Sequence, residues 1–205
     1  MADISISRDE VCELLSKLDV SKSSDPDEVP ARLLREGVPW LADPISRLFN
    51  LSLQHGCLPR DWTSANVAPV YKKGCKHSVS NYRPISLTCI AVKVLERLMH
   101  NHLVQFLSTG NKLSPFQHGF RKGHSCQTQF LETVHEWALS LDRASSTHVI
   151  FIDFSKAFDS VPHKHLLLKL EQVGIRGNIH AWISSFLVHR RQRVLLDENP
   201  LDGLK

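Results

Sequence analysis

The sequence predicts an α+β fold that is rich in helices and contains a small antiparallel sheet. Three observations predict it: apolar residues recur at helical spacing in several long segments, two short β-prone runs flank a glycine-containing loop, and no apolar stretch is long enough to span a bilayer. The chain has 205 residues, of which 42% are hydrophobic and 22% are charged, an ordinary globular composition. A chain of this length buries a substantial core, so a disordered tail and a disulfide-held miniprotein are both excluded.

The first 55 residues are predicted to be helical with one interruption. Ser7 and Glu10 have the spacing of a capping box and precede an apolar series, so a helix is expected to begin there. Residues 21–30 are polar and contain prolines, which is typical of a linker. A short helix is expected over residues 30–37, because proline suits the first turn of a helix and glycine suits its end. The apolar spacing of residues 40–55 predicts a longer helix.

The centre of the chain is predicted to form a hairpin followed by two long helices. Residues 67–71 and 82–87 are β-prone, and the basic segment 72–81 that joins them contains a glycine. Apolar residues at helical spacing predict helices over residues 91–107 and 125–141, and the second of these begins with a serine that suits the N-cap.

The C-terminal third contains a different kind of signal. Residues 147–154 form a continuous, β-branched and apolar run, which is typical of a strand covered on both faces. Helices are expected over residues 163–173 and 178–189, and residues 190–197 resemble the start of another strand.

The charge distribution favours a polyanionic partner. Residues 1–30 hold three basic and eight acidic side chains, whereas the remaining 175 residues hold 22 basic and 13 acidic ones. The excess of positive charge in residues 31–205 attracts phosphate groups. The charge pattern alone leaves open whether the chain binds nucleic acid or no charged partner at all.

Cysteine and histidine spacing argues against a disulfide framework and a zinc site. The five cysteines are odd in number and lie 14 or more residues apart, so they are interpreted as free thiols. None of the twelve histidines belongs to an HExxH pattern. The first residues show neither a secretory signal nor a transit peptide, which indicates an intracellular chain without a membrane partner; nucleus and cytoplasm are not distinguished.

Asp153 is the residue that most needs an explanation. It follows four apolar residues of the predicted buried strand, and an isolated charge in such a place is costly. The carboxylate must therefore be paired, protonated, exposed at the strand end or bound to a cation. A helix-capping or ion-paired aspartate and a metal ligand both remain open at this point.

The residues around Asp153 carry a resemblance to a known family. The stretch IFIDFSKAFDSVPH, residues 150–163, resembles motif A of reverse transcriptases from non-LTR (LINE-type) retrotransposons, particularly the jockey and CR1-like groups. Further stretches resemble that family in the same order: VPARLLREG (29–37), WTSANVAPVYKKG (62–74), NYRPISLTC (81–89), QHGFRKGHS (117–125), HLLLKLEQVGIRG (165–177) and RRQRV (190–194).

The resemblance implies a partial right-hand polymerase fold, made of the fingers and the front half of the palm. It divides the chain into an N-terminal helix and linker (1–28), a fingers region (29–145) and a partial palm with motif A (146–205). It also implies an RNA template, a DNA primer and dNTP as partners.

The resemblance assigns roles to the residues of motif A. Asp153 is implied to be the first catalytic aspartate and a ligand of two Mg²⁺ ions, with the backbone carbonyl of Phe154 as a further ligand. Backbone N–H groups near Lys156 and Ala157 are implied to face the triphosphate. Phe158 is implied to be a steric gate that excludes a ribose 2′-hydroxyl; its alternative is a core aromatic.

The resemblance also assigns roles to cations outside motif A. Lys72 or Lys73 and Arg83 are implied to grip the β- and γ-phosphates of the nucleotide, and their alternative is a solvated basic turn. Arg121 and Lys122 are implied to bind nucleic acid, although Arg121 equally suits a bracing role.

The sequence departs from the family in one respect. No Ala-Asp-Asp block follows Asp153, and the adjacent acidic pair Asp197 and Glu198 resembles a turn. With one metal-binding aspartate, the 205 residues are expected not to synthesise DNA alone. Two interpretations remain: part of a reverse transcriptase domain, or a non-catalytic remnant that binds nucleic acid or protein.

Overall fold

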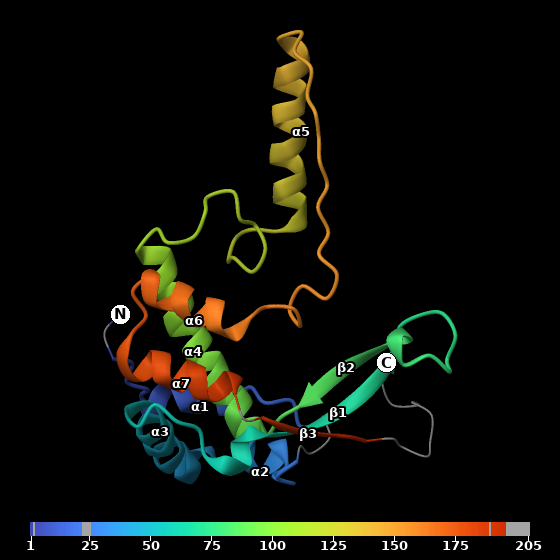
Figure 1. Cartoon of the computed structure of the whole chain (residues 1–205). Helices are drawn as coiled ribbons and strands as arrows, with labels where there is room; N and C mark the ends of the chain where they lie inside the picture. Colours follow the sequence, from blue (N-terminus) through green and yellow to red (C-terminus); the bar gives the residue numbers. More distant parts are fainter. Residues whose placement is uncertain (2, 22–25, 189, 196–205) are drawn as a thin grey trace. The chain divides into compact units, whose positions relative to one another are not determined.

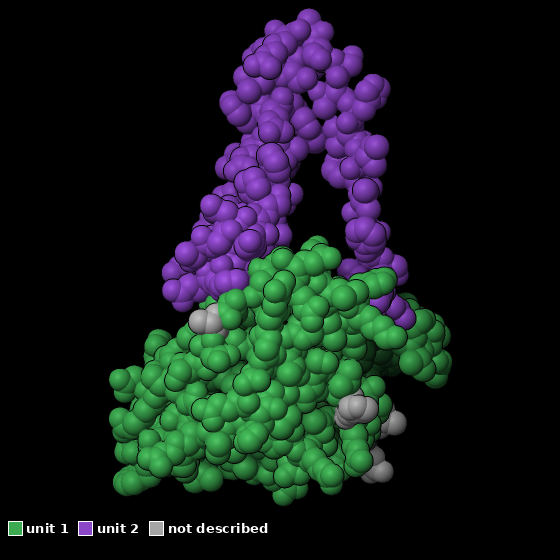
Figure 2. Space-filling model, turned by 60° about the vertical axis from the view of Figure 1, so that its left-hand side comes forward, with its two compact units in different colours: residues 1–104, 163–205 green, residues 105–162 purple. Residues whose placement is uncertain are grey.

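The computed structural model describes residues 1, 3–21, 26–188 and 190–195 (Figure 1). These residues form two compact units, which are coloured separately in Figure 2. Unit 1 comprises Met1–Val104 and His163–Lys205, and unit 2 comprises Gln105–Pro162. The predicted acidic pair Asp197 and Glu198 lies outside the described residues.

Unit 1 begins with three helices whose ends follow local sequence signals. Helix α1 (Arg8–Ser16) is capped by the predicted reciprocal bonds between Ser7 and Glu10. Helices α2 (Ala31–Glu36) and α3 (Val38–Gln54) are separated by Gly37. The predicted helices in this region are therefore confirmed.

The hydrophobic core of unit 1 lies among α1, α3, α4 (Ile90–Thr109) and α7 (Gly177–Leu187), with α6 (His163–Gln172) packed on α7. Its largest fully buried side chains are Phe49, Leu15, Leu95, Ile175, Ile179, Val11 and Val92. One buried polar contact joins distant segments, because the indole N–H of Trp182 donates to the Ser52 hydroxyl at 3.0 Å. None of the described helices is long and apolar enough to cross a membrane.

The sheet of unit 1 has the strand order β2-β1-β3 (Figure 1). Strand β1 (Ser64–Tyr71) follows the short helix η1 (Arg60–Thr63) and pairs antiparallel with β2 (Tyr82–Leu87), which confirms the predicted hairpin. Strand β3 (Arg191–Val194) pairs parallel with β1. The predicted antiparallel sheet is therefore a mixed one, because a third strand from the far end of the chain joins β1.

Unit 2 consists of the last residues of α4, a loop, helix α5 (Cys126–Asp142) and a returning segment. Ser125 caps α5, as its sequence predicts. After a turn at residues 143–144, the chain runs back in the opposite direction to the helix (Figure 1). The hydroxyl of Thr147 donates to that of Ser140 and ties the start of this segment to α5.

The predicted strand over residues 147–154 is wrong for this structure. The segment has no regular secondary structure, and its large side chains are exposed; Phe151, for example, is 86% exposed. A strand covered on both faces needs hydrogen-bonding neighbours and packing partners. Within the described residues, the three-stranded sheet does not include this segment, so Asp153 is exposed rather than buried at a strand end.

Candidate functional site

The hairpin of unit 1 presents the three cations of the predicted triphosphate grip. Lys72 and Lys73 come directly after β1, and Arg83 lies on β2 opposite Val70. All three side chains are exposed, and none of them forms an ion pair with another described residue. Their charges are therefore available to an external anion.

The loop that joins β1 and β2 is held in one conformation by its own hydrogen bonds. The Lys72 N–H donates to the Asn81 carbonyl at 2.8 Å, and the Asn81 amide donates to the Cys75 carbonyl at 2.9 Å. Gly74 has φ +97°, and a Cβ there would lie only 2.7 Å from the Asn81 amide nitrogen. The loop therefore requires glycine at this position, and it holds its cations on an ordered support.

The segment that contains the hairpin carries no negative charge. Between Asp61 and Glu96 the sequence has no aspartate or glutamate, while it has five lysines and arginines. One of them, Lys76, lies with its ammonium 5.7 Å from the Tyr71 ring centroid and was not among the predicted site residues. The absence of acidic residues over this stretch is the sequence signal that identifies Lys76 as a further member of the basic hairpin.

The motif A segment of unit 2 forms an exposed turn. Residues 155–160 are turn residues, and the Ser160 N–H donates to the Lys156 carbonyl at 3.0 Å. Lys156 has φ +50°, in the left-handed region. Neither its backbone N–H nor that of Ala157 donates to another described residue, so both are available to an acceptor.

The described residues do not supply a complete site for two Mg²⁺ ions. Asp153 is exposed in a segment without regular structure, as is Phe154, whose carbonyl is the other predicted ligand. No group of three or more His, Cys, Asp or Glu side chains in the described part of the chain is arranged to hold a metal ion. One carboxylate and one carbonyl do not fit a two-metal site by themselves, because Mg²⁺ pairs need several anionic oxygens.

Phe158 lies in the same turn and is 79% exposed. The alternative reading of this residue as a core aromatic is therefore wrong in this structure. Its ring contacts the ring of Phe120 edge to face, with a centroid distance of 5.9 Å and an interplanar angle of 89°. The structure thus brings the predicted gate together with the loop that precedes α5.

That loop, residues 114–125, is organised around a buried histidine. His118 is 5% exposed, and its ring nitrogens lie 2.9 Å from the Thr128 hydroxyl and 3.0 Å from a Glu132 carboxylate oxygen of α5. Arg121 is half-buried and donates to the carbonyls of Ser114 at 2.8 Å and Gln117 at 3.3 Å. These bonds give Arg121 a bracing role within its loop.

Lys122, the other predicted nucleic-acid ligand in this loop, is exposed. No ion pair joins it to another residue in the part of the chain that the structure describes. Of the two predicted nucleic-acid ligands, it is therefore the one whose charge is available.

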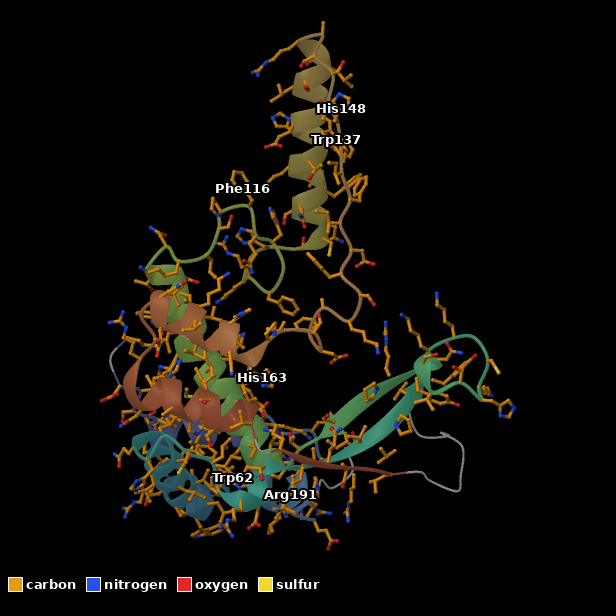
Figure 3. All side chains as sticks on the ribbon, viewed as in Figure 1. Trp62, Phe116, Trp137, His148, His163 and Arg191 are labelled. Carbon is orange, nitrogen blue, oxygen red and sulfur yellow. The ribbon has the colours of Figure 1, made fainter. Side chains whose placement is uncertain are left out.

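The cavities of the described residues are not lined by the predicted site residues. One of about 610 Å³ in unit 1 is lined by Leu58, Arg60, Asp61, Thr63, Ser64, Ser185, Val188 and Arg191, none of which is a predicted site residue. Arg191 is labelled in Figure 3.

Glu96 on α4 is a titratable residue that was not among the predicted site residues. Burial on α4 raises the pKa of its carboxyl group, and the charge of Arg190 partly offsets that effect.

Two kinds of comparison relate this chain to known proteins. Residues 70–202 match the family described as Reverse transcriptase (RNA-dependent DNA polymerase). The RNA-directed DNA polymerase from mobile element jockey of Drosophila melanogaster is 28% identical over 193 residues, which are 94% of this chain and 21% of that protein. The probable RNA-directed DNA polymerase from transposon BS of the same organism is 28% identical over 184 residues, which are 89% of this chain and 20% of that protein.

A third relative comes from a different element. The Pol polyprotein from type-1 retrotransposable element R2 of Popillia japonica is 28% identical over 139 residues, which are 67% of this chain and 19% of that protein. The chain thus spans about one fifth of the length of the curated relatives that it matches.

Proposed function

Because this chain belongs to the reverse transcriptase (RNA-dependent DNA polymerase) family, in its non-LTR retrotransposon branch, we propose that it forms the nucleotide-binding part of a reverse transcriptase domain. The observation that carries the proposal is that the matched residues 70–202 contain both the cations of the basic hairpin and the turn that resembles motif A. The partners are an RNA template, a DNA primer and dNTP. In this proposal residues 29–145 are the fingers region and residues 146–205 carry part of the palm.

The hairpin cations bind the triphosphate of the incoming nucleotide. Lys72, Lys73 and Arg83 are exposed in a segment that contains no acidic residues. Their positive charges therefore attract a phosphate group, and no carboxylate of this segment competes with it. The guanidinium of Arg83 suits this task because it bonds two phosphate oxygens at once. The exposed Lys122 is a contact for the nucleic-acid backbone.

Asp153 supplies one carboxylate of the catalytic metal site. Mg²⁺ belongs to the complete polymerase, in which further carboxylates complete the site that the described residues leave partial. The 205 residues contain no Ala-Asp-Asp block, so we propose that they bind nucleotide without extending a primer. The alternative is a non-catalytic remnant, which would bind the RNA template but not the nucleotide. The following experiment distinguishes this alternative from the proposed nucleotide-binding function.

Replacing Arg83 by glutamine is expected to weaken dCTP binding to the full chain about tenfold or more, because charge-assisted hydrogen bonds contribute roughly 1.5–3 kcal/mol. The affinity for dCMP changes little, since the hairpin binds the β- and γ-phosphates. Calorimetric titration with each nucleotide measures both. The matched control is Arg32→Gln, which removes an exposed arginine that pairs with Glu36. Equal dCTP affinity in the Arg83 variant and the wild type would refute the grip, and binding of RNA without any dCTP binding would favour the remnant.

Replacing Phe158 by alanine is expected to bring the affinities for dCTP and CTP close together, because the ring that excludes the 2′-hydroxyl is removed. Competition between the two nucleotides on the full chain measures the ratio. Phe151→Ala is the control, since Phe151 is 86% exposed in the preceding segment and has no assigned role. An unchanged ratio in the Phe158 variant would remove the gate assignment.

A further inference from the structure

The contact between Phe120 and Phe158 joins two residues that are far apart in the sequence. Their rings meet edge to face at 5.9 Å, an arrangement that aromatic side chains favour. Phe120 is 85% exposed and Phe158 is 79% exposed, so the pair lies at the surface of unit 2 and not in a core. Burial of apolar surface therefore does not by itself account for the position of either ring.

The backbone of Phe120 is strained. Its φ is +60°, in the left-handed region that bulky side chains rarely adopt. A phenylalanine in this conformation persists only when the surrounding structure holds it, and such strain is concentrated at functional sites.

The residues on either side of Phe120 provide that support. His118 is buried and lies within hydrogen-bond distance of Thr128 and Glu132 on α5. Arg121 donates to two carbonyls of its own loop. The backbone at residues 119 and 120 is thus held from both ends, which fixes the point from which the Phe120 side chain extends.

We infer that Phe120 is a positioning residue for Phe158, and that it sets how strongly the site discriminates between deoxyribonucleotides and ribonucleotides. This inference rests on the proposed function of Phe158. An exposed phenylalanine exchanges between rotamers, and a ring that moves aside cannot exclude a hydroxyl group. The Phe120 ring occupies one side of the Phe158 ring and restricts that exchange.

The experiment measures the ratio of dCTP to CTP affinity of the full chain for Phe120→Ala. The ratio is expected to fall about 2- to 10-fold, which is the range that an aromatic pair contributes to an equilibrium. Phe116→Ala is the matched control, because Phe116 lies in the same loop, is 77% exposed and makes no ring contact with a described residue (Figure 3). The control is expected to keep the wild-type ratio.

The Phe120→Gly variant distinguishes the effect of losing the ring from the effect of changing the loop conformation. Glycine adopts φ +60° without strain, so this variant is expected to lose discrimination as Phe120→Ala does while its thermal midpoint does not fall. A Phe120→Gly variant with the wild-type ratio would overturn the inference. The double variant with Phe158→Ala is expected to match Phe158→Ala alone, because Phe120 acts only through that ring; a further fall would also overturn it.

The outcomes also distinguish this inference from the proposed function. If Phe158→Ala changes the ratio and Phe120→Ala does not, the positioning role is wrong and the gate stands. If Phe158→Ala leaves the ratio unchanged, or if the wild type does not discriminate or binds neither nucleotide, the gate itself is wrong and the inference fails with it.

Discussion

Primer extension is expected to fall at least about 100-fold when Asp153 is replaced by asparagine in a longer chain that joins these 205 residues to an Ala-Asp-Asp block. Asparagine keeps the size of the side chain and removes its charge. Stabilisation of charge by metal ions contributes several kcal/mol to such reactions, and each 1.4 kcal/mol changes the rate about tenfold. Single-turnover extension of a DNA primer on an RNA template measures the loss.

The same variant is expected to keep its affinity for the template, because cationic side chains, and not carboxylates, attract the phosphates of RNA. Asp159→Asn is the matched control, since Asp159 is also exposed, lies in the turn that follows Asp153 and is expected to have no metal-binding role. Extension at the wild-type rate in the Asp153 variant would contradict the catalytic assignment. Equal losses in the two variants would show that the turn tolerates neither change, which also removes the specific role of Asp153.

Phe49→Ala is expected to lower the free energy of unfolding by about 3–5 kcal/mol. Phe49 is fully buried in α3 and is among the largest fully buried side chains of unit 1. Its ring contacts that of Trp62 edge to face, with a centroid distance of 5.8 Å. The truncation removes this contact and leaves a cavity, and both effects destabilise the folded state.

Urea unfolding of the full chain, followed by tryptophan fluorescence, measures this change, and the buried Trp62 reports on the site directly. Trp40→Ala is the control, because Trp40 is also on α3 but is 77% exposed, so its loss is expected to cost less than about 0.5 kcal/mol. A loss below about 1 kcal/mol for Phe49→Ala would mean that this side chain is not part of a closely packed core.

The candidate residues lie on two separate supports, a hairpin in unit 1 and a turn in unit 2. The hairpin loop is held by hydrogen bonds among its own residues, and its cations have no acidic neighbours in the sequence. The motif A turn is exposed, and its contact with Phe120 comes from a loop that His118 anchors to α5. The two supports give separate predictions: the hairpin is proposed to determine affinity for the triphosphate, and the Phe120 contact is proposed to determine recognition of the sugar.

The sequence by itself determined the features that depend on near neighbours. Ser7 and Glu10 form the predicted capping box, Ser125 caps α5, and the hairpin pairs β1 with β2 over a ten-residue loop. Each of these rests on contacts within a few residues, where side-chain type and spacing are sufficient. The resemblance to the reverse transcriptase family also came from the order of the residues, and the family match over residues 70–202 confirms it.

Only the tertiary structure decided the features that depend on distant partners. Pairing of β3 with β1 joins residues 127 apart, as the bond from Arg193 to Asn66 shows, and makes the sheet mixed. Residues 147–154 have the apolar sequence of a buried strand, but no described strand pairs with them. The segment therefore does not form a strand. Burial of His118 and the contact between Phe120 and Phe158 also depend on α5 and on the turn, because whether a side chain is covered is set by what packs against it and not by its own neighbours in the chain.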